Sequence, residues 1–224
     1  MTNKRPLGLP PARLIVIAAV AGLIAGAVAV YVRTAGSGNA NVAGAEVAAA
    51  GGACEGTAEL ARRVDDLARG EVAAMTPVEP PRPVALSFKG PEGQDLQTTD
   101  FQGKTVLLNL WATWCGPCRE EMPALNTLQT DMGGEDFEVV AVNIDTGSDE
   151  KPKAFLAETG VDALGYYRDS SMGVFNALKK EGLAFGLPVT LLLDRNGCIV
   201  SAMNGPAAWD SPDAKAMISA AKGS

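Results

Sequence analysis

Two of the four cysteines in this chain of 224 residues stand three positions apart, in Cys115-Gly116-Pro117-Cys118. The apolar run Thr105–Trp111 precedes them, which predicts a buried strand leading into a helix. Cys115 then falls at the helix start, where unpaired N–H groups and the helix dipole favour a thiolate, and Pro117 fits the first turn. Gly116 keeps that turn uncrowded. We predict that Cys115 attacks a partner's disulfide and that the deeper Cys118 resolves the mixed disulfide.

Two other interpretations of this pair remain open: a purely structural disulfide, or half of a metal site. Zinc would need about two more ligands, and the chain has no histidine and no second C-x-x-C. We therefore predict no metal and no cofactor. Copper(I) binding by Cys115 and Cys118 is kept as an alternative, because thiolates suit that ion. Trp111 and Trp114 flank the pair, and Trp114 is expected to shield the sulfurs.

Composition excludes several function classes. Without histidine, catalysis by Ser-His-Asp or Cys-His groups is impossible. The net charge of −7 is unevenly distributed, since residues 1–33 hold four basic and no acidic side chains. The remainder has 15 basic against 26 acidic side chains, a net charge of −11. An acidic body repels phosphate backbones, so we expect no nucleic-acid partner.

The sequence of the N-terminal region predicts a membrane anchor. Residues 14–32 contain no charge, and a helix of 19 residues spans roughly 28 Å, close to the hydrocarbon thickness. Lys4, Arg5 and Arg13 precede it against Arg33 alone after it, which keeps the N-terminus cytoplasmic and exports the rest. A cleaved signal peptide is the alternative. Either segment places the body in an oxidising compartment, where disulfides can persist.

The other two cysteines, Cys54 and Cys198, lie far apart in the sequence. Two unpaired thiols are unexpected in an exported protein, so we predict a structural disulfide between them. It would hold an amphipathic helix expected over Glu55–Met75 against a hairpin around Asp194–Val200. A second redox relay or an intermolecular bond remains the alternative.

The chain divides into four predicted parts. Residues 1–33 are the cytoplasmic N-terminus and anchor, 34–52 a Gly/Ala-rich linker, 53–79 an N-terminal helical extension, and 80–224 the main domain. In the main domain, apolar runs such as Phe137–Ile144 alternate with helical segments such as Met172–Lys180, and a hairpin and a last helix follow. This order predicts an α/β sandwich. Trp209, near the last helix, is expected to pack in the core.

The run LLNLWATWCGPCREEMPAL resembles the active-site segment of thioredoxin-like proteins, especially the membrane-anchored periplasmic TlpA/ResA-type reductases. Gly103-Lys104 upstream and Glu121-Met122-Pro123 downstream also match that subgroup, and the resemblance covers roughly residues 80–222. It implies a thioredoxin fold, a central mixed sheet flanked by helices. It also implies electrons delivered by a membrane donor, and exported targets with disulfides in cytochrome oxidase biogenesis, such as the copper chaperone and the copper-A subunit.

The same resemblance implies further site residues. Pro188 is expected to follow a cis peptide bond beside the disulfide, which would expose the Leu187 backbone to pair with a substrate strand. One position departs from thioredoxin, which has a buried aspartate six residues before its first active-site cysteine, where this chain has Asn109. Glu120, Glu121 and Lys104 are candidates to replace that acid, but we expect the two glutamates to be solvated and the lysine exposed.

The sequence leaves open whether the cysteine pair gives electrons to a target disulfide or takes them from target thiols. The Gly-Pro dipeptide resembles that of reducing thioredoxins, whereas strong oxidants of the family have a histidine between their cysteines. A dithiol reductase is therefore favoured. A disulfide oxidase or isomerase in the periplasm is the alternative, beside the copper-binding assembly factor.

Overall fold

The computed structural model describes residues 54–223, and the predicted membrane span and linker lie outside them. Among the described residues, no helix is both long enough and apolar enough to cross a membrane. The elements are α3 (Thr57–Asp65), β1 (Thr76–Pro77), β2 (Ser87–Lys89), β3 (Asp95–Gln97), β4 (Thr105–Trp111), α4 (Gly116–Met132), β5 (Phe137–Asn143), α5 (Glu150–Glu158), β6 (Tyr167–Arg168), α6 (Gly173–Lys180), β7 (Val189–Leu193), β8 (Ile199–Asn204) and α7 (Pro212–Lys222), with short 3-10 helices at Gly70–Val72 and Thr98–Phe101.

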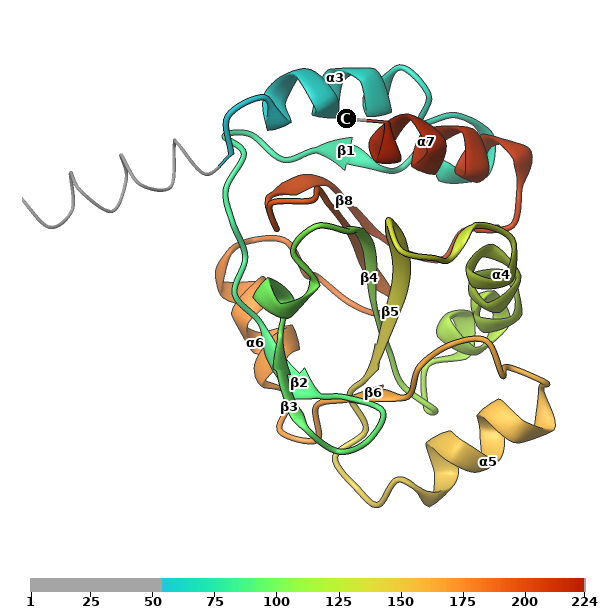
Figure 1. Ribbon diagram of the computed structural model, residues 1–224. Helices are drawn as coiled ribbons and strands as arrows, with labels where there is room; N and C mark the ends of the chain where they lie inside the picture. The colour runs from blue at the N-terminus through green and yellow to red at the C-terminus, as the bar shows by residue number, and fades with distance from the viewer. Residues whose placement is uncertain (1–53, 224) are drawn as a thin grey trace, which may run out of the picture. The chain divides into compact units, whose positions relative to one another are not determined.

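The strands of the described region form one mixed sheet in the order β1-β8-β7-β4-β5-β6-β2-β3. The pairs β4–β5 and β5–β6 are parallel and the other pairs are antiparallel. Helices cover both faces, with α4 and α5 on one side of the sheet and α6 on the other (Figure 1). This is the thioredoxin-like α/β architecture.

The central strand β4 is buried along its whole length, and its side chains point alternately into two hydrophobic cores, one on each face of the sheet. Leu107 and Trp111 pack with α4, α5 and α7, whereas Val106, Leu108 and Leu110 pack with α6. Asn109 shares the parity of Leu107 and Trp111. The strand pleat therefore turns this polar side chain toward α4.

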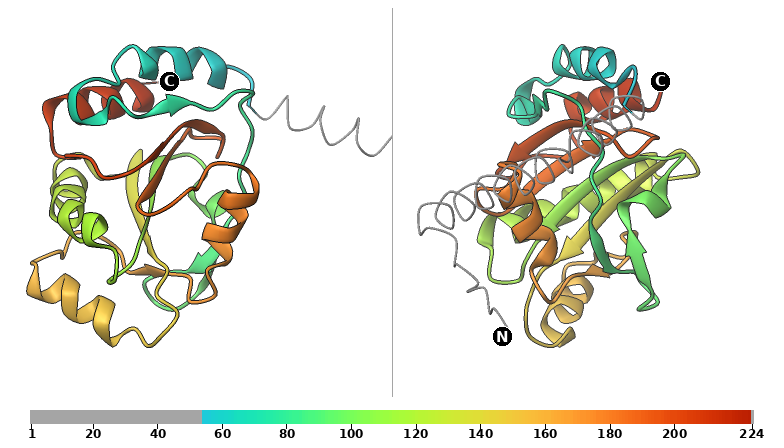
Figure 2. Two further views of the ribbon diagram at one scale, coloured as in Figure 1. Left: turned by 180° about the vertical axis from the view of Figure 1, so that it is seen from behind. Right: turned by 90° about the vertical axis from the view of Figure 1, so that its left-hand side faces the viewer.

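The N-terminal extension differs from the single helix expected over Glu55–Met75. Helix α3 ends at Asp65, and a separate 3-10 turn begins at Gly70. Gly70 has φ +53°, a left-handed backbone conformation that favours glycine, and the Asp213 carboxylate lies against it. Helix α3 packs on β8 and α7, which both views of Figure 2 show side by side with it.

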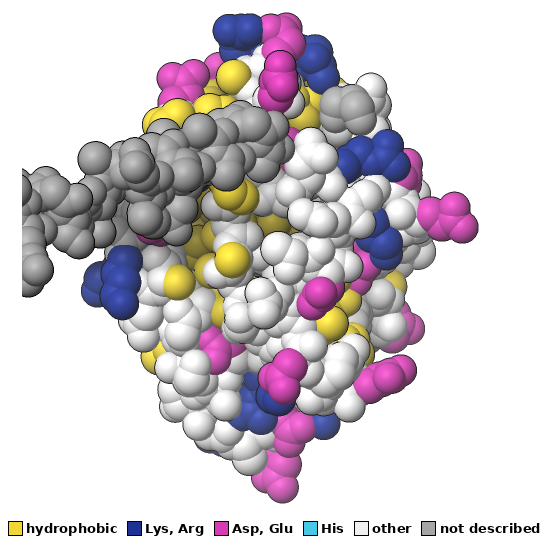
Figure 3. All heavy atoms as spheres, turned by 60° about the vertical axis from the view of Figure 1, so that its left-hand side comes forward, with side chains coloured by type: hydrophobic (Ala, Val, Ile, Leu, Met, Phe, Trp, Pro, Cys, Tyr) yellow, Lys and Arg dark blue, Asp and Glu magenta, His cyan; other side chains and the backbone are white. Residues whose placement is uncertain are grey.

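The surface carries charged side chains of both signs. Figure 3 shows acidic and basic groups interspersed over one face, with small hydrophobic areas between them. Only Trp114 and Phe185 are large hydrophobic side chains that stand exposed in the described part of the chain.

Candidate active site

Cys115 and Cys118 are joined by a disulfide at the N-terminus of α4. Cys115 is the N-cap residue, and its Sγ accepts a hydrogen bond from the backbone N–H of Cys118 at 3.2 Å. Cys115 is 6% exposed and Cys118 is fully buried. A target disulfide can therefore reach only Cys115, whose sulfur already lies where the helix stabilises negative charge.

The loop before Cys115 is held by Asp145, just beyond the end of β5. Its carboxylate accepts hydrogen bonds from the backbone N–H of Thr113 at 2.9 Å and from the Thr113 hydroxyl at 2.8 Å. A third donor, the amide of Asn143, lies 2.7 Å away. Because Asp145 is buried and satisfied by three donors, it fixes the turn that presents Trp114 and Cys115.

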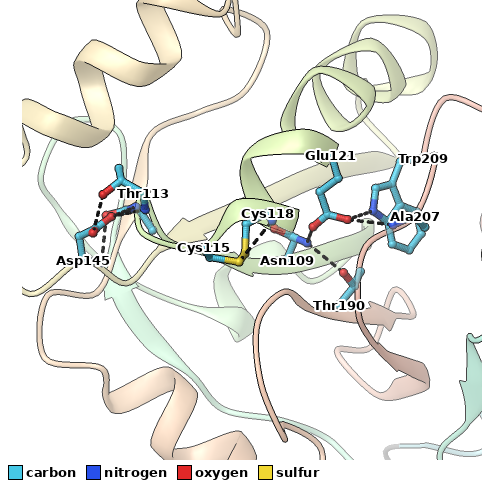
Figure 4. The surroundings of a disulfide bond; sticks show 10 residues. Asn109, Thr113, Cys115, Cys118, Glu121, Asp145, Thr190, Ala207 and Trp209 are labelled. Carbon is cyan, nitrogen blue, oxygen red and sulfur yellow. Dashed lines mark hydrogen bonds between the residues drawn. A yellow bond between two sulfur atoms is a disulfide. The ribbon is translucent and has the colours of Figure 1, made fainter.

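Glu121 corrects an expectation from the sequence. We predicted a solvated carboxylate, but the side chain is 3% exposed, because it lies on the inner face of α4 one turn beyond Cys118. One oxygen accepts from the Asn109 amide at 2.9 Å, and the other accepts from the Trp209 indole at 2.9 Å and the Ala207 backbone N–H at 3.1 Å. Figure 4 shows Glu121 on the helix that bears Cys118, with its carboxylate directed at the Asn109 amide and the Trp209 indole.

Burial has the largest effect on the pKa of Glu121. Removal from water raises the pKa of Glu121 to about 7, although the hydrogen bonds from Asn109, Trp209 and Ala207 act in the opposite direction. A carboxyl with a pKa near neutrality can take a proton and return it at physiological pH. Glu121 therefore has the protonation behaviour that Asn109 cannot supply.

The same network extends to the strand that follows Pro188. The Asn109 amide also donates to the Thr190 hydroxyl at 2.9 Å, whereas its buried carbonyl oxygen has no partner. If the Asn109 amide turned over, that oxygen could accept a hydrogen bond from a protonated Glu121. Asn109 can thus donate to the ionised carboxylate of Glu121 and, when turned over, accept from the protonated carboxyl.

The remaining predicted residues lie as follows. The peptide bond between Leu187 and Pro188 is cis, and the Leu187 backbone forms no hydrogen bond with any other residue in the range 54–223. Gly116 and Pro117 are exposed at the helix start. Trp114 was expected to shield the sulfurs, but it is 65% exposed, so most of its surface faces solvent beside them.

The other candidates for the missing acid lie outside the network. Glu120 is exposed on the outer face of α4. Lys104 forms an ion pair with Glu138 at 2.8 Å instead of standing free. Trp209, which the sequence predicts only to pack, is both fully buried and a donor to Glu121.

Cys54 and Cys198 form the second disulfide, the pairing expected from the sequence. It joins the segment before α3 to the turn between β7 and β8. Nearby, the Thr57 hydroxyl donates to the buried Asp194 carboxylate at 2.6 Å. Within residues 54–223, no group of three or more Cys, Asp or Glu side chains is arranged to hold a metal ion.

Comparison with known proteins gives a consistent set of relatives. A family model described as Redoxin matches residues 80–218. The thiol-disulfide oxidoreductase ResA of Geobacillus thermodenitrificans is 35% identical over 114 residues, covering 51% of this chain and 62% of that protein. The thioredoxin-like protein YneN of Bacillus subtilis is 37% identical over 119 residues, covering 51% and 64%.

A solved structure from Chlorobium tepidum, assigned as a thiol:disulfide interchange protein DsbE, is also similar. It has a TM-score of 0.53 at 29% identity, covering 62% of this chain and 94% of that one. The chain spans about 62% of the length of the curated relatives it matches first.

Proposed function

The chain belongs to the redoxin family, in its TlpA/ResA-like branch, and on this premise we propose that it is a dithiol reductase of disulfides in exported proteins. One observation carries the proposal. The Cys115–Cys118 disulfide stands at a helix N-terminus, with one sulfur near the surface and the other fully buried, and Glu121, a buried carboxyl with a pKa of about 7, lies one helical turn beyond Cys118.

The order in which the two sulfurs react follows from their burial, because Cys115 is nearer to the surface than Cys118. The Cys115 thiolate attacks one sulfur of the target disulfide, a mixed disulfide forms, and the other target sulfur leaves as a thiolate that takes up a proton. Cys118 then loses its proton toward Glu121 and attacks the Cys115 sulfur, which releases the second target thiol. Two electrons pass to the target, and the enzyme pair becomes the disulfide that the structure contains. A dithiol donor at the membrane restores the reduced pair.

The substrate contacts belong to this proposal as well. Trp114, Gly116 and Pro117 border Cys115, and the unpaired Leu187 backbone before Pro188 offers a strand edge to an extended target segment. The anchor over residues 14–32, the linker 34–52, the extension 53–79 and the domain 80–224 would hold this site at the periplasmic face of the inner membrane. Targets in copper-A assembly of cytochrome oxidase fit that location.

The test is the reduction potential of the Cys115–Cys118 pair in the full chain, equilibrated in thiol buffers. A reductase should lie near the thioredoxin value of about −270 mV and far from the DsbA value of about −120 mV. Cys115→Ser should abolish reduction of a test disulfide, whereas Cys118→Ser should trap the target as a mixed disulfide. A potential near the oxidant value would instead support the disulfide oxidase or isomerase.

A further inference from the structure

The connection between β8 and α7 is fixed to the site at three points. Gly205 donates its backbone N–H to the carbonyl of Pro188 at 2.9 Å. Ala207 then donates its backbone N–H, and Trp209 its indole N–H, to the same carboxylate oxygen of Glu121. The connection therefore ties the cis-proline end of β7 to the buried carboxyl on α4.

Trp209 contributes more than packing to this connection. Its side chain is fully buried in the core formed with α4 and α7, where a purely apolar ring would fill space equally well. The indole adds one polar N–H, which a buried site must satisfy. Its partner is Oε2 of Glu121 at 2.9 Å, on a residue 88 positions away in the sequence.

The two carboxyl oxygens of Glu121 have different partners. Oε2 accepts from the Trp209 indole and the Ala207 backbone, two N–H groups that can only donate, so a proton on Oε2 would oppose both. Oε1 accepts from the Asn109 side-chain amide, which can turn over and present its oxygen. Figure 4 shows Trp209 and Asn109 approaching the carboxylate from different sides. A proton on this carboxyl therefore belongs on Oε1, toward β4.

The groups that face Glu121 from the neighbouring elements are neutral. Asn109 approaches from β4, and the connection supplies Trp209 and one backbone N–H. On α4 itself, Glu120 is exposed and Cys118 is held in the disulfide. Within residues 54–223, Glu121 forms no ion pair. Its protonation is therefore governed by burial and by these hydrogen-bond donors.

We propose that Trp209 is a positioning residue for the thiol–disulfide reaction, whose indole N–H holds one oxygen of Glu121 as an acceptor and leaves the oxygen that faces Asn109 to take the proton of Cys118. This inference rests on the proposed function, in which Glu121 accepts that proton. The indole also favours the ionised carboxylate, because hydrogen bonds to a charged acceptor are stronger than those to a neutral one. Loss of the N–H should therefore raise the pKa of Glu121.

The first measurement is a pH titration of the oxidised full chain in mild detergent, followed by the infrared band of the protonated carboxyl. Glu121→Gln assigns the band, because that variant lacks it. Trp209→Phe keeps an aromatic ring and removes the donor, and it should raise the pKa of Glu121 from about 7 to about 8. No thiol reacts in this measurement, so it tests the hydrogen bond separately from the reductase function.

Two further variants separate the donor from the packing. Trp209→3-benzothienylalanine replaces only the indole N–H by sulfur and keeps the shape of the side chain, so it should raise the pKa of Glu121 as Trp209→Phe does. Met217→Ala removes a fully buried side chain of α7 in the same core without removing a donor. It should lower the stability and leave the pKa of Glu121 unchanged.

The second measurement is the two-phase reduction of dithiodipyridine, whose released thiol absorbs light. The first thiol is released by attack of Cys115, and the second by attack of Cys118 on the mixed disulfide. At pH 7 the second phase should be about five-fold slower in both Trp209 variants, because the ionised fraction of Glu121 falls from about one half to about one tenth. The first phase should be unchanged, and the difference in the second should narrow as the pH rises.

The outcomes distinguish this inference from the function on which it rests. An unchanged pKa in both Trp209 variants, or an equal rise in Met217→Ala, would overturn the role of the indole and leave the reductase intact. A raised pKa with an unaltered second phase would show that Glu121 is not the proton acceptor, which overturns the positioning role as well. No thiol release by the unaltered chain at any pH would overturn the proposed function itself.

Discussion

At the scale of single residues, the proposed proton chemistry of the site rests on Glu121, a buried carboxyl with a raised pKa. Thioredoxin-like proteins with a strand aspartate place their buried acid on β4, and this chain has Asn109 at that position. Here the carboxyl comes from α4 instead, and Asn109 links it to Thr190. The acid is therefore kept in the interior but moved from the strand to the helix that bears the cysteines.

The first prediction concerns the pH dependence of stability. The pKa of Glu121 rises from 4.5 to about 7 on folding, so the folded protein binds more protons than the unfolded chain between those values. Its contribution to the free energy of unfolding is complete below pH 4.5 and is lost as the pH rises through 7, a change of about 3 kcal/mol. Glu121→Gln should remove this fall, measured by urea unfolding at pH 5 and pH 8.

The same variant should slow catalysis. Without a group to accept the Cys118 proton, release of the target from the mixed disulfide at pH 7 should fall about ten-fold or more. Glu120→Gln is the matched control, since it neutralises the neighbouring carboxyl on the exposed face of α4. An unchanged pH profile in Glu121→Gln would show that water, and not this side chain, accepts the proton.

At the scale of elements, two connections hold the site and its surroundings in place. Asp145 ties the end of β5 to the loop before α4, so the parallel β4–β5 pair determines where Cys115 stands. The Cys54–Cys198 disulfide ties the segment before α3 to β8. The first connection positions the reacting sulfur, whereas the second stabilises the layer formed by α3 and α7.

The second disulfide should contribute mainly to stability. In the chain-entropy model, closing 144 residues between Cys54 and Cys198 is worth about 5 kcal/mol, against about 2 kcal/mol for the short loop between Cys115 and Cys118. Replacing Cys54 and Cys198 by serine should therefore lower the free energy of unfolding more than the double replacement of Cys115 and Cys118. The variant without Cys54 and Cys198 should still reduce dithiodipyridine, a small neutral disulfide. Loss of that activity would assign the second pair a redox role.

At the scale of the whole molecule, the proposed function needs the catalytic domain to be held at a membrane. The described domain carries the reacting disulfide, and the proposed span over residues 14–32 would tether it through the linker 34–52. A net charge of −11 on the exported part would keep it soluble at the surface. The electron donor and the targets would then meet the same exposed edge of the site.

Membrane attachment is directly measurable. In bacterial cells, the full chain should remain in the membrane pellet after carbonate extraction, and a protease added outside spheroplasts should digest residues 80–224. A variant with Leu14–Val32 interrupted by two lysines should lose the pellet fraction, because each charge at the centre of a span costs about 3 kcal/mol. Recovery of the unaltered chain in the soluble periplasmic fraction, shortened at its N-terminus, would support the cleaved signal peptide.

Features that depend on local order along the chain were predictable from the sequence. The Cys115–Cys118 pair and its place between a buried strand and a helix follow from spacing and from the apolar run before it. The α/β order was predicted by the alternation of apolar runs with amphipathic helical segments. The single helix expected over Glu55–Met75 was wrong, because α3 ends at Asp65 and the backbone is extended at Arg69 and left-handed at Gly70.

Features that depend on distant segments were decided only by the tertiary structure. Glu121 contacts Asn109, which lies 12 residues earlier in the sequence, and Trp209, which lies 88 residues later. Its burial, its raised pKa and its partners therefore cannot be predicted from its position in the first turns of a helix. The groove beside the disulfide likewise combines the loop around Trp114 with helix α5, more than 30 residues later. The sequence by itself determined where the cysteine pair lies relative to a strand and a helix, because that spacing is local, whereas packing between distant segments decided which carboxyl is removed from water.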